Sequence, residues 1–223
     1  MSTAGLPGSQ LLYEILRRRN DPGFRKQRAE LRRGADETTE YYAIPYVFPA
    51  LPPNSNEHER IALLRMAALA AEFVDVPAFQ RGDELKRKPF GRWCQEVSRQ
   101  KMKLHSEGAT SEEIPSAAAE SETLDRSRND AIAERLAYLH TQDLEEAIKT
   151  VRRILQIAVA SKPVPPLDYF DLYRLLLHWG KGASAESRAM RMSPLRNYYS
   201  SFTLSTNEPG GKTAPLNDPY KGE

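Results

Sequence analysis

A sixteen-residue apolar stretch, HERIALLRMAALAAEF at positions 58–73, constrains the fold more than any other part of the chain. At the helical period, its Leu, Ala and Met side chains occupy most sides of the helix. Only His58, Arg65 and Glu72 recur at every seventh position, and we expect them to form an exposed strip. A helix that is apolar on most sides is largely buried, so other elements must surround this segment.

The remaining sequence predicts helices almost everywhere and no convincing strand. Helical spacing of apolar side chains recurs over residues 9–19, 24–33, 58–73, 86–104, 125–140, 141–161, 166–182 and 193–202. Ser9 is the expected cap of the first helix, and Ser193 with Pro194 form the cap and first-turn pair expected to start the last. Between Tyr41 and Asn56, four prolines predict short helical turns packed by tyrosine and phenylalanine. We therefore expect an all-α fold.

Acidic and basic residues are distributed unevenly along the chain and indicate how it divides into domains and linkers. Residues 106–125 carry six acidic and no basic side chains, so the formal net charge of +2 conceals a basic remainder. This stretch and the end of the chain from Asn207 are rich in Ser, Ala, Pro and Gly, and poor in the large apolar groups that stabilise a fold. We expect two bundle-like helical subdomains joined by a flexible acidic linker. The predicted parts are an N-terminal subdomain (1–104), a disordered acidic linker (105–123), a C-terminal subdomain (124–206) and a flexible tail (207–223).

Several classes of protein find no support in the sequence. No apolar run approaches the ~20 residues needed to span a bilayer, and the first residues lack the pattern of a secretion signal, so we expect a cytoplasmic protein. The single cysteine, Cys94, cannot form an internal disulfide and is expected to be a buried thiol. No helix sets a basic face against an apolar face that the core does not need, which argues against a membrane partner.

An enzymatic function is equally unsupported. The chain has no phosphate-binding glycine loop, no dinucleotide fingerprint and no metal-ligand spacing of Cys or His. Its four histidines lie far apart in sequence, and the paired acids Glu112 and Glu113 fall in the linker, where nothing would fix their geometry. We therefore expect no catalytic residue, no cofactor and no metal site.

The basic residues, in contrast, gather on single faces of the predicted helices. Arg25, Arg28 and Arg32 fall within about 60° of one another, and Lys88, Arg92, Arg99 and Lys103 do the same on a later helix. The positive charges within each row repel one another, so such rows indicate an anionic partner that neutralises them. The phosphate backbone of a nucleic acid can contact several short rows of basic residues at once. The candidate nucleic-acid-binding residues are Arg25, Arg28, Arg32, Arg33, Lys88, Arg92, Arg99, Lys103, Arg152, Arg153, Arg174 and Lys181.

Each candidate also has a structural explanation. Lys181 follows a helix end, where any cation gains from the helix dipole, and Arg174 can pair with Asp171 three residues earlier. Arg152 and Arg153 have no acidic residue within one turn, which favours a binding role. Two tryptophans, Trp93 and Trp179, are able to stack on bases, but their apolar faces favour core packing.

Five segments carry a resemblance to a known family. They occur in the order AELRR, HERIALLRMAALAAEF, VRRILQIA, PLDYFDLYRLLLHWGK and SSFTLSTN. Together they resemble the small subunit, CasB, of the type I-E CRISPR surveillance complex Cascade. The basic positions that match the family's pattern are Arg32, Arg33, Arg152, Arg153, Arg174 and Lys181, whereas the other candidates rest on helical phase alone.

The resemblance implies an all-helical, non-catalytic protein of antiviral defence. Two copies would sit together in the complex beside its large and backbone subunits. They would contact the guide RNA and target DNA and help to hold the displaced strand of the R-loop. A second hypothesis is a helical interaction scaffold whose basic faces bind acidic partner subunits. A measurement of nucleic-acid binding by the isolated chain would separate the two.

Overall fold

The computed structural model describes residues 5–79, 88–107, 130–180 and 184–200, and confirms the all-α class. Within these residues the backbone is helical apart from turns, loops and an isolated parallel bridge between Ala78 and Leu167. The α-helices are α1 (Ser9–Arg18), α2 (Arg25–Arg32), α3 (Ile44–Val47), α4 (Glu57–Glu72), α5 (Phe90–Glu107), α6 (Ala131–Leu139), α7 (Leu144–Ala160), α8 (Tyr169–Leu177) and α9 (Ala185–Tyr199). Short 3-10 helices are η1 (Pro22–Phe24), η2 (Arg33–Ala35), η3 (Glu40–Tyr42) and η4 (Phe48–Ala50).

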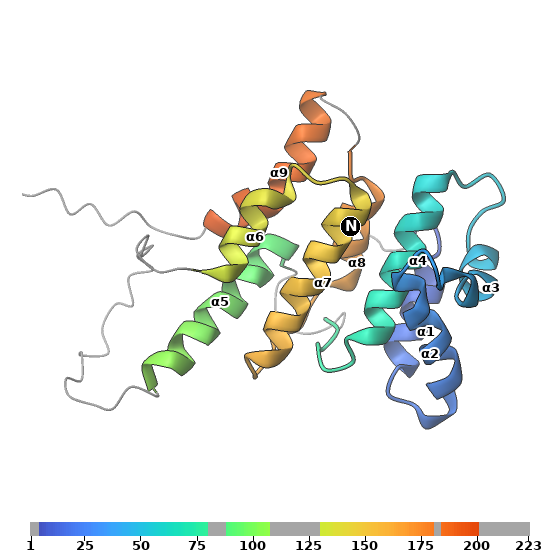
Figure 1. Cartoon of the computed structure of the whole chain (residues 1–223), viewed down its shortest axis with the longest axis horizontal. Helices are drawn as coiled ribbons and strands as arrows, with labels where there is room; N and C mark the ends of the chain where they lie inside the picture. The colour runs from blue at the N-terminus through green and yellow to red at the C-terminus, as the bar shows by residue number, and fades with distance from the viewer. Residues whose placement is uncertain (1–4, 80–87, 108–129, 181–183, 201–223) are drawn as a thin grey trace, which may run out of the picture.

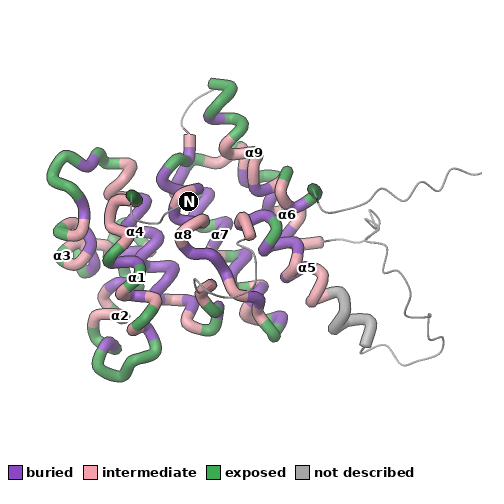
Figure 2. Tube along the Cα trace, turned by 180° about the vertical axis from the view of Figure 1, so that it is seen from behind, coloured by how far each residue is buried: buried purple, intermediate pink, exposed green. Residues whose placement is uncertain are grey.

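Helix α4 is the most completely buried helix of the N-terminal part. Every residue from Ala62 to Ala71 is buried (Figure 2), which confirms the predicted burial of the apolar side chains but not the expected exposure of Arg65. The helix starts at a capping box, in which Asn56 accepts a hydrogen bond from the Glu59 amide and the Glu59 carboxylate accepts one from the Asn56 amide. Helices α1, α2, α7 and α8 all pack against it.

The helices form two groups with α7 and α8 between them (Figure 1). Helices α1 to α4 lie at one end, and α5, α6 and α9 at the other. Buried apolar side chains from both groups belong to one continuous cluster, so a single core runs through the whole described fold.

The packing of α5 bears on the predicted division of the chain. The sequence assigns residues 88–104 to an N-terminal subdomain, but α5 packs mainly against α9 and also against α6. Packing therefore groups α5 with the C-terminal helices. Most of the predicted linker and all of the tail lie outside the described residues, so those boundaries stay predictions.

Two predicted helix starts are wrong. Helix α1 has Gly8 at its N-cap, with a φ of 67° and no side-chain cap, in place of the expected cap Ser9. Helix α9 begins at Ala185 behind Ser184, whose hydroxyl accepts from the Ser187 amide at 3.1 Å, and Pro194 lies inside the helix. A Ser-Pro pair looks the same at a helix start and in a helix interior, so the sequence could not separate them.

Candidate nucleic-acid interface

Helix α2 presents the most uniform basic surface. From Arg25 to Arg33 every exposed charged side chain is basic: Arg25, Lys26, Arg32 and Arg33. Its acid, Glu30, is only half-exposed and accepts a hydrogen bond from the Tyr46 hydroxyl. Leu31 turns the opposite side into the core. The face therefore carries four positive charges and no exposed acid.

Arg28 does not belong to this exposed face. Its guanidinium donates a hydrogen bond to the Arg19 carbonyl oxygen at 2.7 Å, and the side chain is half-buried. Helical phase placed Arg28 with Arg25 and Arg32, but the contact joins the start of α2 to the end of α1. The main role visible for Arg28 is therefore to stabilise that turn.

Two exposed tyrosines beside Arg33 were missed by the sequence analysis, which expected them to pack inward. Tyr41 is 58% exposed and Tyr42 37% exposed. Their ring centroids lie 4.2 Å apart, and the Arg33 guanidinium lies 4.0 Å from the Tyr42 ring centroid. A pair of adjacent tyrosines in a proline-rich segment has no periodicity that would have shown which way the rings turn.

Arg65 joins the N-terminal helices to α7. It is 2% exposed, and its guanidinium lies 2.7 Å from a Glu40 carboxylate oxygen and 2.8 Å from one of Glu145. A third bond, at 2.7 Å, goes to the Gly34 carbonyl oxygen. Burial lowers the pKa of Arg65, but the two carboxylates outweigh it and hold that pKa above its ordinary value.

The predicted exposed strip His58, Arg65 and Glu72 is therefore wrong. Glu72 is 2.7 Å from Arg152 of α7, and His58 contacts the carbonyl oxygens of Leu176 and Leu177 at 3.2 and 3.0 Å. The two ion pairs are Arg65–Glu145 and Glu72–Arg152. From the first pair to the second, both helices advance by seven residues, because α4 and α7 run parallel (Figure 1). A polar strip that was expected to face solvent is the contact of α4 with α7 and, through His58, with α8.

On α7 the two candidate arginines differ. Arg152 donates to Glu72, a partner 80 residues away that no search at helical spacing can find. Arg153 is exposed, as are Lys149 and Gln156 on the same face. Hydrogen bonds from Thr38 lower the pKa of Asp36, and the charges of Arg65 and Lys149 lower it further.

The α5 candidates are mixed. Lys88 lies 2.7 Å from the Glu96 carboxylate, whereas Arg92 is exposed and Arg99 is half-buried. The backbone of Lys103 belongs to α5, but its side chain lies outside the described part of the structure. Of this set, Arg92 is exposed, and no carboxylate of the described residues contacts it.

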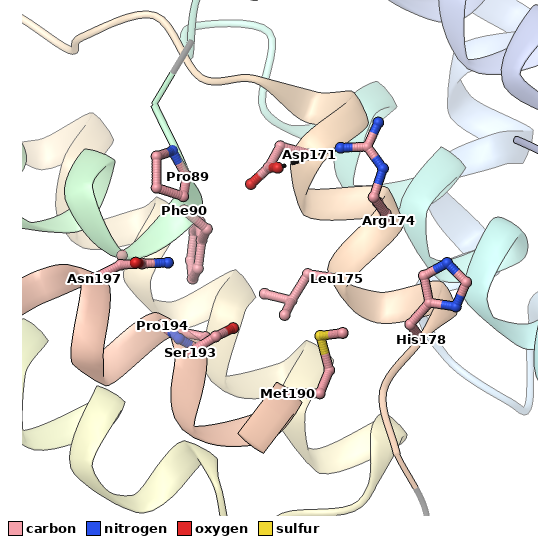
Figure 3. A pocket seen from close by; sticks show the side chains of 11 residues that line it. Pro89, Phe90, Asp171, Arg174, Leu175, His178, Met190, Ser193, Pro194 and Asn197 are labelled. Carbon is pink, nitrogen blue, oxygen red and sulfur yellow. Dashed lines mark hydrogen bonds and ion pairs between the residues drawn. The ribbon is translucent and has the colours of Figure 1, made fainter. Parts of the chain in front are cut away.

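Helix α8 carries Arg174 beside a pocket of about 160 Å³ between α5, α8 and α9 (Figure 3). Arg174 Nη1 is 3.5 Å from the Asp171 carboxylate, the local pair foreseen as its structural explanation. His178 is exposed at the end of the helix, and Lys181 lies outside the described residues. Leu175, Phe90 and Met190 make the pocket walls largely apolar.

The segments that carry the family resemblance are largely structural. Asp168 caps α8 by accepting from the amides of Phe170 and Asp171.

Trp93 and Trp179 are buried, as expected, and donate to carbonyl oxygens of Pro165 and Gln142. Cys94 is also buried, and burial raises the pKa of its thiol well above the usual range. The segment SSFTLSTN falls almost wholly outside the described residues.

The described residues contain neither a membrane-spanning helix nor a cluster of metal ligands. None of their helices combines the length and hydropathy that crossing a bilayer requires. Across the same residues, no cluster of three or more His, Cys, Asp or Glu side chains has an arrangement able to hold a metal ion.

Comparison with known proteins identifies the family. The sequence profile described as CRISPR-associated protein Cse2 (CRISPR_cse2) matches residues 27–199. Two solved structures, both from Thermus thermophilus, have a similar fold: TTHB189, a CRISPR-associated protein of the Cse2 family (20% identity, TM-score 0.55), and CasB (21% identity, TM-score 0.54). Each alignment covers 87% of this chain and 99% of the other. A comparison with curated protein sequences gives no significant match. Because the profile spans most of the chain, including α2, α4, α7 and α8, the chain belongs to the Cse2 (CasB) family of CRISPR-associated proteins.

Proposed function

We propose that this chain is a non-catalytic small subunit of a CRISPR RNA-guided DNA surveillance complex that grips nucleic-acid backbone with its basic helix faces. In such a complex, pairing between the guide RNA and the target strand supplies the sequence information. A subunit that stabilises the open R-loop, including the displaced strand, therefore needs only to hold phosphates. The chain would act in antiviral defence, as a pair of copies in contact with the large and backbone subunits.

The observation that carries this proposal is the exposed face of α2 and η2. Arg25, Lys26, Arg32 and Arg33 are exposed there without an exposed acid among them. The positive charges on such a face repel one another and destabilise the fold unless an anion neutralises them. A polynucleotide does so over several residues at once, because each bound cation releases counterions from the strand.

The contacts rank the candidate residues. Arg25, Arg32, Arg33, Arg92 and Arg153 are exposed, so water surrounds much of each charge and a phosphate can reach it. Arg28, Lys88, Arg152 and Arg174 have internal partners, which they would have to exchange for phosphate, and Arg99 is half-buried. Lys103 and Lys181 remain candidates on sequence alone.

Salt dependence of binding tests the proposal. Fluorescence anisotropy with a labelled single-stranded DNA, at salt concentrations from about 50 to 200 mM, gives the slope of log affinity against log salt. The double variant Arg25→Ala/Arg32→Ala should lower the steepness by ~1.4, since each lost single-strand contact removes ~0.7. Arg18→Ala is the matched control, because Arg18 is paired with Glu14 at 2.9 Å and lies near the same end of the fold.

The scaffold hypothesis predicts a different result. Arg152, Lys88 and Arg174 already contact carboxylates of their own chain, and acidic surfaces of partner subunits would extend the same chemistry. In that case the isolated, folded chain would bind no single-stranded, double-stranded or R-loop DNA. If the wild-type chain binds DNA and the double variant has the same salt slope, α2 is not part of the interface.

A further inference from the structure

Arg33, Tyr42 and Tyr41 form a stack on the surface at η2 and η3. The Arg33 guanidinium lies 4.0 Å from the Tyr42 ring centroid, and the Tyr42 and Tyr41 centroids are 4.2 Å apart, with the two ring planes tilted by 31°. Tyr41 is the more exposed of the two rings, at 58%. The stack therefore ends in an aromatic ring that is open to solvent.

The hydrophobic core does not account for these rings. Tyr46 and Phe48, only a few residues later, pack against the core as partly buried side chains. Tyr41 and Tyr42 belong neither to the core nor to the apolar side chains that cover it. Two neighbouring large aromatic rings left in water indicate a binding surface.

The backbone under the stack is held in place from both sides. Arg65 donates to the Gly34 carbonyl oxygen at 2.7 Å and pairs with Glu40 at 2.7 Å, so one buried side chain binds η2 and η3 together. The Thr39 hydroxyl adds a bond to the Arg33 carbonyl oxygen at 2.8 Å. A stack fixed in this way loses little conformational freedom when a ligand binds it.

The charge around the stack is suited to a polyanion. Arg33 lies against Tyr42, and its neighbour Arg32 is also exposed. Lys149 is exposed on α7, one helical turn from Glu145, which pairs with Arg65. Three acids lie there: Asp36 accepts two hydrogen bonds from Thr38, Glu37 is exposed, and Glu40 is paired with Arg65. Aromatic rings next to arginines, on a surface of positive balance, are the usual platform for single-stranded nucleic acid.

We propose that the Arg33–Tyr42–Tyr41 stack is a platform for an unpaired nucleobase, which extends the stack on Tyr41 while Arg32 and Arg33 hold the flanking phosphates. This inference rests on the proposed nucleic-acid function and adds to it a site that recognises bases. Every base has a flat face, so the platform would favour single strands over duplexes without reading sequence.

Tyr41→Ala tests the platform on two oligonucleotides, one normal single strand and one of the same length made of abasic sites. The variant should bind the normal strand about 5- to 100-fold more weakly, the loss expected for one stacked base. Its affinity for the abasic strand should equal that of the wild type, and its salt slope should not change, because no charge is removed. Tyr41→Trp should restore binding to the normal strand.

Tyr138→Ala is the matched control, because Tyr138 on α6 is also a highly exposed tyrosine, at 70%. An equal effect of the two alanine variants, or an equal loss on the abasic strand, would overturn the platform while leaving the phosphate grip intact. A wild-type chain that binds neither oligonucleotide would overturn both proposals. If Tyr41→Ala instead weakened only the assembly with other subunits, the tyrosines would belong to a protein contact and the platform would be refuted.

Discussion

Arginine in this chain serves two opposite purposes that its sequence context does not separate. Arg19 is 4% exposed and donates to the carbonyl oxygens of Phe73 and Val76, at 3.1 and 2.6 Å, beyond the end of α4. Arg65 is equally buried and joins three separate segments. Such cations are held by their own chain and cannot meet a phosphate, so the total of 32 basic residues overstates the charge available for binding.

Removal of Arg65 should destabilise the fold more than removal of any exposed arginine. We expect Arg65→Ala to lower the free energy of unfolding by about 3 kcal/mol, the low end for breaking a buried pair, because Glu40 and Glu145 keep some contact with water. The midpoint of urea unfolding measures the loss. Arg153→Ala, an exposed control on α7, should change the free energy by less than about 0.5 kcal/mol, and equal midpoints for the two variants would contradict the assignment.

At the scale of elements, periodicity predicted which helices form but not how they meet. The apolar pattern of residues 58–73 correctly predicted a buried helix, and the stripe of residues 141–161 matches α7. The pairing of α4 with α7 depends on charges 80 residues apart, which one sequence cannot reveal. Pro194 was wrongly placed at a helix start: it lies inside α9, buried where α9 crosses α5, a tertiary contact that the local sequence does not show.

The same limit applies to the candidate site. Helical phase identified Arg25 and Arg32 as exposed neighbours, because that depends on one helix alone. It could not show that Arg28 bonds to the Arg19 carbonyl oxygen or that Arg152, a candidate from the family pattern, pairs with Glu72, because those partners come from other elements. Periodicity shows which side chains share a helix face, but it does not show whether that face meets solvent or another helix, as His58, Arg65 and Glu72 demonstrate.

The close crossing of α5 and α9 gives a prediction for Gly91. A Cβ atom there would overlap the Pro194 carbonyl oxygen and lie 2.9 Å from the Asn197 Cβ, and a backbone oxygen cannot turn aside as a side chain can. Gly91→Ala should therefore cost about 1–3 kcal/mol of stability, the range for overpacking a core. Thermal unfolding followed by circular dichroism measures it.

Gly23→Ala is the control for this substitution. A Cβ at Gly23 would meet its nearest atom, the Asp21 carboxylate, at an ordinary 3.4 Å. Its melting temperature should match that of the wild type. If Gly91→Ala also melted at the wild-type temperature, α5 and α9 would have to be separated by more than the structure indicates.

At the scale of the whole molecule, three buried tyrosines tie distant segments together. The Tyr173 hydroxyl donates to the Pro7 carbonyl oxygen at 2.7 Å, 166 residues away. Tyr169 reaches the segment after α4, at the Phe73 carbonyl oxygen, and Tyr198 of α9 donates to Asp130 at the start of α6. Burial raises the pKa of each of these tyrosines above its ordinary value. A phenolate cannot donate, so ionisation is incompatible with all three contacts.

The fold should therefore lose stability above about pH 10. Unfolded tyrosines ionise near pH 10, whereas the folded ones keep their protons to higher pH. Above pH 10 the unfolded state thus binds fewer protons, and the free energy of unfolding falls as the pH rises. Below pH 10 both states are protonated, so the tyrosines contribute no pH dependence there. Urea unfolding at pH 8.0 and at about pH 10.5 measures the fall.

Tyr173→Phe isolates the contribution of one tyrosine. The variant lacks the hydrogen bond to Pro7, which lowers its stability equally at both pH values. This loss cancels when the change in stability between the two pH values is taken for each protein separately. Between pH 8 and about pH 10.5, the variant should lose about 0.8 kcal/mol less than the wild type, the ionisation free energy of one unfolded tyrosine. Lysines and the other tyrosines titrate alike in both proteins, so they do not affect this difference. An identical fall in the two proteins would mean that Tyr173 ionises as readily in the folded chain as in the unfolded one, against its burial in the core.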